Sequence, residues 1–204
     1  TILITGAVQS NYVRSAAAAA ARLGLHAVLQ LEERVTGMGA PYYRSGNVLL
    51  AEILGAEHIR YPVGEDEAGA DAALHARADD IKANGGKPYV IHLGAGHPPL
   101  GSLGYVAGGF ELCAQMSDFD AVVVPSGSGA THAGLVTGLR LSGQSAPVYG
   151  ICVRRDRDQQ HVRVKTVLEK LADMLGIDPM LACADIITSD SALAPGYGKM
   201  DPST

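Results

Sequence analysis

A run of glycine and hydroxyl-bearing residues follows a short apolar stretch near the middle of the chain. The run is Ser126, Gly127, Ser128, Gly129, Ala130 and Thr131. The apolar residues at 121–124 are typical of a buried strand, and the residues after Thr131 have the apolar spacing of a helix. A tight turn from strand to helix leaves backbone N–H groups unpaired at the positive end of the helix dipole, where a phosphate accepts hydrogen bonds from them. The run therefore indicates a phosphate-binding loop.

A plainer interpretation of the same residues is an ordinary turn in which Thr131 is the N-cap of the following helix. From the loop alone the two interpretations are equally good. The well-known nucleotide loops do not fit, because a dinucleotide motif would need glycine in place of His132 and a P-loop would need a lysine after its last glycine. A hydrolase nucleophile turn would require glycine in place of both Ser126 and Ala130.

A second polar cluster follows the first apolar stretch of the chain. Gln9, Ser10 and Asn11 place two amides and a hydroxyl at the start of an expected helix. Such a cluster can hold a substrate carboxylate against the helix dipole. Taken alone, Ser10 is better explained as a helix cap. Both clusters follow strands, and ligands of open parallel sheets collect beyond the carboxyl ends of strands, so each cluster strengthens the functional interpretation of the other.

The composition excludes several classes of protein. The chain has 204 residues, of which 47% are hydrophobic and 18% charged, with a formal net charge of −5. The one arginine-rich segment, 154–158, alternates with acidic residues, which indicates a solvated loop and argues against a nucleic-acid partner. No apolar run reaches membrane-spanning length and no signal peptide is recognised, so we expect no membrane partner and a cytoplasmic location.

The cysteines and histidines show no pattern of metal ligands. Three cysteines lie far apart in apolar contexts and are expected to be structural thiols. The seven histidines have no recognisable metal spacing, and no carboxylate is expected near His92 or His97, which flank a glycine-rich turn. We therefore expect no metal site.

Strand-like and helix-like segments alternate along the chain, which predicts an α/β fold with mainly parallel sheets covered by helices. Strands are expected at residues 2–5, 26–31, 58–61, 88–92, 121–124, 148–153 and 185–188, and helices at 11–23, 46–54, 68–84, 103–116, 131–141 and 162–175. The Gly/Pro-rich segment 94–101 is the best candidate for a hinge. We expect a small domain of residues 1–92 and a large domain of residues 93–204. The abrupt ends suggest an internal piece of a longer polypeptide, with both domains incomplete, although a naturally short chain also fits.

Five motifs in register resemble one enzyme family. They are Gly6–Arg14, Gly46–Leu50, Pro99–Val106, Ser126–Leu135 and Ala194–Gly198. In this order they are similar to the motifs of D-cysteine desulfhydrases and 1-aminocyclopropane-1-carboxylate (ACC) deaminases, which are pyridoxal-phosphate enzymes of the tryptophan-synthase β-like fold, fold type II. Two departures are small: Tyr12 replaces the family's usual histidine, and Gly129-Ala130 replaces its Ala-Gly or Gly-Gly pair.

The resemblance implies a role for each of these residues. The cofactor's phosphate would bind the N–H groups and hydroxyls of the loop from Ser126 to Thr131. Asn11 would hydrogen-bond the phenolic oxygen of the cofactor ring, and Gln9 and Ser10 would meet the substrate carboxylate. Ser10 and Tyr197 would be the catalytic residues, with Ser10 as an acid, base or nucleophile and Tyr197 assisting it by proton transfer. The resemblance also implies a homodimer that acts on a small amino acid.

The resemblance further implies a lysine that holds the cofactor, in an Asn-Lys context upstream of Gln9. None of the five lysines of the chain, Lys82, Lys87, Lys165, Lys170 and Lys199, has this context. We therefore expect the 204 residues to be inactive by themselves. In the full-length parent we expect conversion of D-cysteine to pyruvate, ammonia and sulfide. The alternatives are ACC deamination, cysteate sulfo-lyase activity, and a non-catalytic protein that binds a phosphate-bearing ligand.

Overall fold

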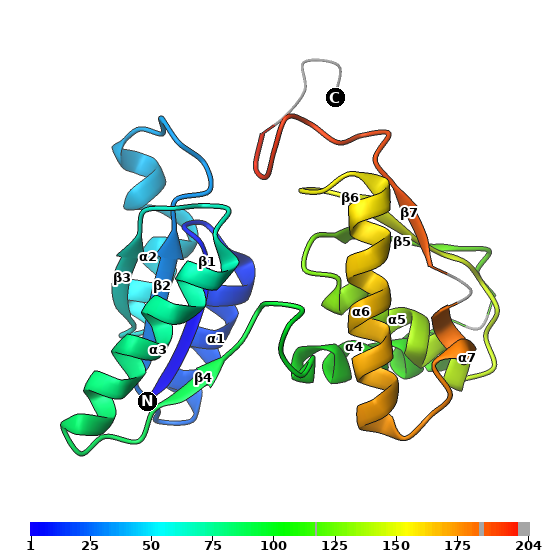
Figure 1. Ribbon diagram of the computed structural model, residues 1–204, viewed down its shortest axis with the longest axis horizontal. Helices are drawn as coiled ribbons and strands as arrows, with labels where there is room; N and C mark the ends of the chain where they lie inside the picture. Colours follow the sequence, from blue (N-terminus) through cyan, green and yellow to red (C-terminus); the bar gives the residue numbers. More distant parts are fainter. Residues whose placement is uncertain (117, 184–185, 200–204) are drawn as a thin grey trace. The chain divides into compact units, whose positions relative to one another are not determined.

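The chain folds into two compact units. The computed structural model describes residues 1–116, 118–183 and 186–199. Contacts between Cα atoms divide the chain into a first unit, Thr1–Leu93, and a second unit, Gly94–Thr204. The two units are coloured blue to green and green to red in Figure 1. The expected division into a small and a large domain stays a prediction.

The first unit is built on a four-stranded parallel sheet with the strand order β3-β2-β1-β4. Its strands are β1 (Ile2–Ala7), β2 (Ala27–Glu32), β3 (Glu57–Tyr61) and β4 (Tyr89–Ile91). Its helices are α1 (Asn11–Arg22), the short 3-10 helix η1 (Ala40–Tyr43), α2 (Gly46–Ile53) and α3 (Glu67–Ala83). Strands that pair in parallel need crossover connections, and here the three α-helices provide them.

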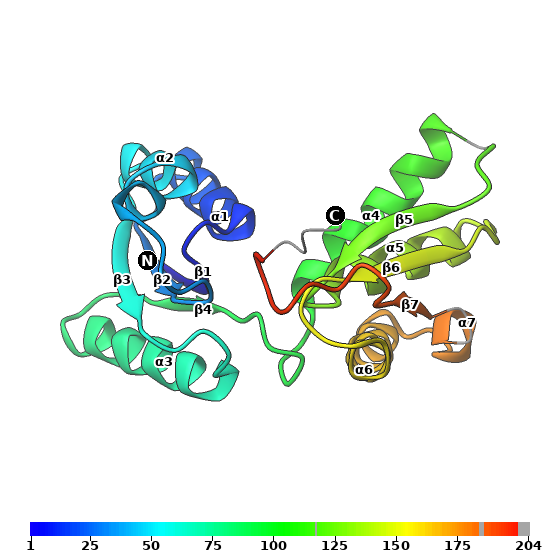
Figure 2. The ribbon, with the colours of Figure 1, turned by 90° about the horizontal axis from the view of Figure 1, so that it is seen from above.

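Helices cover both faces of this sheet, with α1 and α2 on one side and α3 on the other (Figure 2). Alternate residues along a strand point to opposite faces. Ile4 accordingly packs with α1 and α2 residues, whereas its neighbour Leu3 packs with Leu74 and Ala78 of α3. The alanine-rich sequence of α1 lets this helix lie close to the sheet, with Ala17 and Ala20 each 1% exposed.

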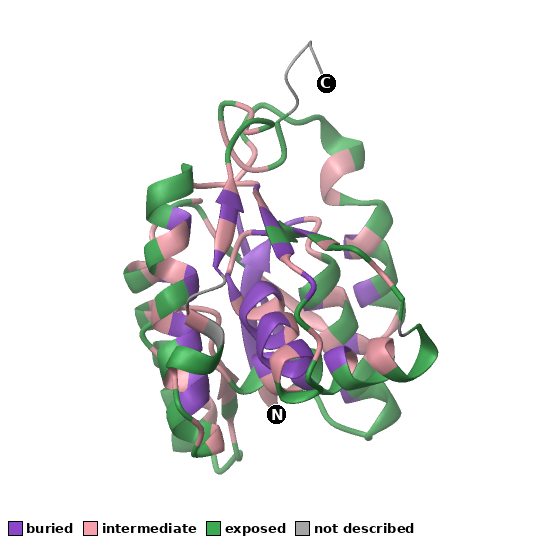
Figure 3. Cartoon of the chain, turned by 90° about the vertical axis from the view of Figure 1, so that its right-hand side faces the viewer, coloured by how far each residue is buried: buried purple, intermediate pink, exposed green. Residues whose placement is uncertain are grey.

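The second unit is built on a three-stranded parallel sheet with the strand order β5-β6-β7. Its strands are β5 (Val122–Ser126), β6 (Val148–Cys152) and β7 (Ile187–Ser189), and its helices are α4 (Leu100–Gln115), α5 (Ala130–Leu141), α6 (Arg157–Leu175) and the short α7 (Met180–Cys183). Residues of α5 and α6 form one core with Val124 and Val148 of the sheet. Burial is concentrated in the strands and along one side of the helices (Figure 3).

Glycines bring α4 and α5 into unusually close contact. A Cβ atom added at Gly138 of α5 would lie 2.3 Å from the backbone oxygen of Val106 in α4. A Cβ at Gly109 of α4 would lie 2.9 Å from Cα of Gly138, and one at Gly134 would lie 2.5 Å from the oxygen of Ser102. Real side chains do not tolerate such distances to backbone atoms, so the two helices pack backbone against backbone at these glycines.

The predicted α/β fold with parallel sheets is confirmed, and most predicted elements match within two or three residues. Two differences lie at helix starts. α4 begins at Leu100 and α6 at Arg157, earlier than the apolar spacing predicts. In α6 the cause is Asp156, whose side chain accepts a hydrogen bond from the Gln159 N–H and caps the helix. Within the described residues, no helix combines the length and apolar character needed to cross a membrane.

Candidate functional site

The loop between β5 and α5 has the geometry of an anion-binding turn. β5 ends at Ser126, and α5 begins at Ala130 with Gly129 as its N-cap. Gly129 has φ +89°, in the left-handed region that favours glycine, so a residue with a side chain would be strained here. Ala130 donates its backbone N–H to the Ser128 hydroxyl oxygen at 3.3 Å, which leaves the Ser128 O–H able to donate elsewhere. The loop and the N-terminus of α5 therefore present donors at one place.

Two arginines anchor the carbonyl groups of this loop. Arg155 Nη1 donates to the carbonyl oxygen of Gly127 at 3.1 Å, and Arg163 Nε donates to that of Ser128 at 2.8 Å. Among the described residues, no backbone carbonyl accepts from the N–H groups of Gly127, Ser128 or Gly129. A loop with its carbonyls held by guanidinium groups and its N–H groups unpaired suits an anion, and the two nearby positive charges add to this preference.

The segment 154–158 is therefore more than the solvated loop that the sequence indicated. Arg155 is half-buried and contacts the loop after β5, and Arg157 and Asp158 belong to α6. Residues 156–158 are exposed as expected, but the expectation fails for Arg155, because the charge pattern carries no information about contacts with a loop 28 residues earlier in the chain.

Gln9 lies after β1, and its side chain is fully engaged with a neighbouring segment of the first unit. Its amide nitrogen donates to the carbonyl oxygens of Tyr42 and Ser45, and its amide oxygen accepts from the Asn47 N–H at 2.9 Å. A Cβ atom at Gly46, which has φ +60°, would lie 2.6 Å from this oxygen. Gln9 thus ties the end of β1 to the start of α2, and a role at the substrate carboxylate stays a prediction.

Ser10 and Asn11 stand at the N-terminus of α1. The Ser10 hydroxyl accepts a hydrogen bond from the Val13 N–H at 3.3 Å, which makes Ser10 the helix N-cap. The exposed Asn11 accepts a hydrogen bond at its side-chain oxygen from Asn47 Nδ2 at 2.8 Å. Asn47 in turn accepts from Arg14 Nε at 3.4 Å. Because Asn47 occupies the amide oxygen of Asn11, the amide N–H groups of Asn11 are the part available to a ligand.

Tyr197 lies in a turn near the end of the described chain. Its side chain is half-buried, between Gly196 and Gly198, and both glycines have positive φ. The turn is closed by a hydrogen bond from the Lys199 N–H to the Gly196 carbonyl at 3.1 Å. Tyr197 belongs to the second unit, as does the loop after β5, whereas Gln9, Ser10 and Asn11 belong to the first.

His132, in the first turn of α5, is a buried histidine whose pKa is lowered. Its ring is completely buried, and its Nε2 lies 3.3 Å from the Val148 carbonyl oxygen. Burial lowers the pKa of His132 to about 4, against the opposing hydrogen bond to Val148, and the nearby His161 contributes to the decrease. The ring is therefore neutral at physiological pH.

The free energy of unfolding is expected to fall by about 3 kcal/mol between pH 6.5 and pH 4 on account of His132. In the unfolded chain the ring takes up its proton near its ordinary pKa of 6.5, so the unfolded state binds more protons over this window and gains stability as the pH falls. Urea denaturation at several pH values measures the effect. A His132→Asn variant lacks the titrating ring and is expected to have a flatter profile, and equal profiles would contradict the prediction.

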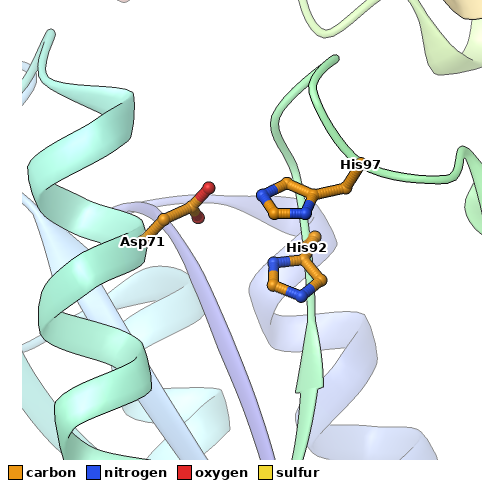
Figure 4. Close-up of side chains that lie close together, drawn as sticks. All are labelled: Asp71, His92 and His97. Atoms are coloured by element: carbon orange, nitrogen blue, oxygen red, sulfur yellow. The ribbon is translucent and has the colours of Figure 1, made fainter.

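One histidine of the first unit lies close to a carboxylate. Asp71 on α3 and His92 after β4 offer ligand atoms within 4.8 Å of each other (Figure 4). The His92 ring also lies beside that of His75, with the ring centroids 5.1 Å apart. The expectation that no carboxylate lies near His92 is wrong, because α3 packs on the sheet and carries Asp71 close to the residue that follows β4.

Three residues that the sequence did not single out hydrogen-bond to residues of the candidate site. Arg155, Arg163 and Asn47 each donate to a candidate ligand-binding segment, but no local pattern in the sequence connects them with it. Asn47 lies within a motif that resembles the enzyme family, which was the only available signal.

Comparison with known proteins gives matches over nearly the whole chain. A family model described as "Pyridoxal-phosphate dependent enzyme" matches residues 1–199. A D-cysteine desulfhydrase of Yersinia pestis (strain Pestoides F) is 40% identical over 202 residues, which are 97% of this chain and 59% of the relative. An ACC deaminase of Methylobacterium nodulans is 36% identical over 208 residues, covering 100% of this chain and 61% of the relative. The chain thus spans about three-fifths of the length of these relatives.

Solved structures show the same similarity. The crystal structure of an ACC deaminase homologue matches with a TM-score of 0.81 and 31% sequence identity, over 97% of this chain and 57% of that one. A maize serine racemase matches with a TM-score of 0.63 and 13% identity, over 95% of this chain and 56% of that one, which shows the fold alone. The predicted resemblance to D-cysteine desulfhydrases and ACC deaminases, and with it fold type II, is confirmed.

Proposed function

The chain belongs to the pyridoxal-phosphate dependent enzyme family, and from this premise we propose that the full-length protein is a D-cysteine desulfhydrase-like lyase. It would convert D-cysteine to pyruvate, ammonia and sulfide. The observation that carries the proposal is the loop after β5, whose unpaired N–H groups and anchored carbonyls suit a phosphate. The similarity to D-cysteine desulfhydrases at 38–40% identity supports this reaction among those of the family.

The second unit fits the phosphate of the cofactor. The segment from Ser126 to Thr131 would hold it, with the backbone N–H groups of the loop donating to one anion at the N-terminus of α5. The half-buried Ser128 and Thr131 carry hydroxyl groups that add donors. Pyridoxal phosphate supplies an electron sink for bonds at the α-carbon of an amino acid, so the protein has to bind, orient and move protons.

In the first unit, Gln9, Ser10 and Asn11 are the residues proposed to contact the cofactor ring and the substrate. Asn47 binds the amide oxygen of Asn11, and the Asn11 N–H groups would donate to the phenolic oxygen of the cofactor ring. Ser10 would meet the substrate carboxylate and act as an acid or base near its α-carbon, with Gln9 beside it. Tyr197, a residue of the second unit, would assist in proton transfer through its hydroxyl group.

We place the lysine that anchors the cofactor outside the 204 residues, which supports the proposal that this chain alone is inactive. Lys170 is engaged elsewhere, because its ammonium group donates to the carbonyl oxygens of Ala95 and Gly96 at 2.7 and 2.6 Å. Lys199 is exposed in the turn after Tyr197. Neither has the Asn-Lys context of the family.

We also propose that the full-length protein is a cytoplasmic homodimer that acts on a small amino acid and on neither membranes nor nucleic acids. Its net charge of −5 supports the absence of a nucleic-acid partner, and the relatives' names support a small amino-acid substrate. The small and large domains proposed from the sequence would correspond to the two units.

A second candidate function is ACC deamination, favoured by the relative at 36% identity and by the structural match at a TM-score of 0.81. A cysteate sulfo-lyase and a non-catalytic phosphate-ligand binder are the remaining alternatives. Incubating the full-length protein with each substrate separates them. D-cysteine is expected to yield sulfide and pyruvate, whereas 2-oxobutyrate from ACC would identify a deaminase and sulfite from cysteate a sulfo-lyase. A protein that binds pyridoxal phosphate but converts none of these would be a binder.

A Ser10→Ala variant of the full-length protein is expected to bind pyridoxal phosphate normally and to lose about a hundredfold or more in turnover. The substitution removes the hydroxyl proposed to act beside the substrate, while the loss of the helix cap costs only about 1 kcal/mol. Steady-state kinetics and the absorbance of the bound cofactor measure the two effects. Ser15→Ala, on an exposed position of the same helix, is the control. Full activity of Ser10→Ala would remove Ser10 from the catalytic residues.

A further inference from the structure

Ser126 differs from the rest of the phosphate-binding loop because its side chain is buried. The residue is 1% exposed at the end of β5. Its hydroxyl oxygen lies 2.9 Å from Gln160 Nε2 of α6 and 3.3 Å from His132 Nδ1 of α5. Both partners are completely buried. The hydroxyl group thus belongs to a polar network beneath the loop.

The proton positions in this network follow from the Val148 carbonyl group. A carbonyl oxygen can only accept a hydrogen bond, so His132 Nε2, 3.3 Å away, carries a proton. The ring is neutral at physiological pH because burial lowers its pKa to about 4. A neutral imidazole has one N–H, so Nδ1 is an acceptor. Among the described residues, the group that donates to it is the Ser126 O–H.

The Ser126 hydroxyl therefore has no donor left for an anion. Its single O–H points to His132, and its oxygen accepts from the Gln160 amide. If the Gln160 amide were turned over, its oxygen would compete for the same O–H, and the hydroxyl would still donate within the network. An anion is bound by donors, which the backbone N–H groups of the following residues provide.

We propose that His132 and Gln160 are positioning residues that hold Ser126 as a buried brace beneath the phosphate-binding loop, and that Ser126 gives no side-chain hydrogen bond to the phosphate. This inference rests on the proposed function, since the anion is taken to be the phosphate of pyridoxal phosphate. The brace joins β5, α5 and α6, and through Val148 also β6. It fixes the point at which the chain leaves β5, directly before Gly127.

The fit around the brace is tight. A Cβ atom at Gly150 of β6 would lie 2.3 Å from His132 Nδ1 and 3.1 Å from Cβ of Ser126. Only glycine at this position leaves room for the imidazole against the strand. A small displacement of the ring would therefore move the N-terminus of α5, where the proposed phosphate site lies.

A double-mutant cycle in the full-length protein tests the brace. Ser126→Ala and His132→Leu are each expected to weaken pyridoxal phosphate binding about tenfold, because each leaves a buried polar group unpaired. The double variant is expected to be no weaker than either single variant, since both remove the same interaction. His132→Asn, which keeps an acceptor near the position of Nδ1, is expected to restore most of the affinity. Additive effects, as for a Ser126 that contacts the phosphate independently of His132, would overturn the proposal.

Two further measurements separate the brace from a general loss of folding. Gln160→Met removes the donor to Ser126 and is expected to weaken cofactor binding. Gln159→Met changes the preceding, exposed residue of α6 and should leave the affinity for the cofactor within about twofold of the wild type. The ¹⁵N NMR signals of His132 should show a neutral ring protonated at Nε2. A charged ring or a proton on Nδ1 would overturn the proposal even if the wild-type protein bound no pyridoxal phosphate, a result that would refute the proposed function itself.

Discussion

Gly127→Asp is expected to lower the affinity of the full-length protein for pyridoxal phosphate by about a hundredfold or more. The substitution places a carboxylate on the half-buried loop proposed to bind a dianion. Two like charges about 4 Å apart repel by roughly 4 kcal/mol at the effective dielectric constant near a protein surface, and a hundredfold change in affinity needs only about 2.7 kcal/mol. Titration of the protein with pyridoxal phosphate, followed by absorbance, measures the loss.

The Gly127→Asn variant separates charge from shape. Its side chain has nearly the size of aspartate but no charge, and its Cβ atom likewise meets Val153 Cγ2 at 3.1 Å. We expect Gly127→Asn to bind the cofactor at least tenfold more tightly than Gly127→Asp, with a difference that shrinks at high salt. Equal affinities of the two variants would show that the loop only needs space at this position. Normal cofactor binding by Gly127→Asp would remove the basis for placing the phosphate here.

The fold follows largely from short-range patterns in the sequence. Apolar runs such as 121–124 mark buried strands, and helical spacing marks the segments that cross between them, so element types and parallel pairing could be predicted. The start of α6 was missed because an aspartate cap, Asp156, outweighs the polar character of the first helical turn. The short helix η1 has too few residues for any period to show.

In the candidate site, too, features set by neighbouring residues could be predicted from the sequence, whereas contacts between distant segments could not. The loop after Ser126 could be predicted as a candidate anion site because the residues of such a turn are adjacent in the sequence. Its supporting residues were not, since Arg163 meets Ser128 across 35 positions and Gln160 meets Ser126 across 34. Such contacts depend on how α6 packs on the sheet. The sequence also could not show that the Gln9 amide is occupied by backbone groups near Asn47, because that pairing depends on the path of the chain around α2.

Gly138→Ala is expected to lower the free energy of unfolding by about 3 kcal/mol or more. The added Cβ atom would lie 2.3 Å from the Val106 carbonyl oxygen and 3.1 Å from Cα of Gly109. These neighbours are backbone atoms of α4, so no side-chain rotation relieves the overlap and the two helices must move apart. Because α5 also carries the proposed phosphate site at its N-terminus, we expect weaker binding of pyridoxal phosphate as well. Urea denaturation and cofactor titration measure the two losses.

Gly108→Ala is the matched control, because the same substitution in α4 meets open space. No atom lies within 4 Å of a Cβ at Gly108, one residue before Gly109, which contacts α5. Alanine favours helix over glycine by about 0.5–1 kcal/mol, so this variant is expected to be slightly more stable than the wild type. The same helix-propensity gain applies at Gly138, so the difference in stability between the two variants measures the cost of the overlap alone. If both variants were stabilised equally, α4 and α5 would not pack backbone against backbone, and the position of α5 would have to be set by the β5–β6 sheet instead.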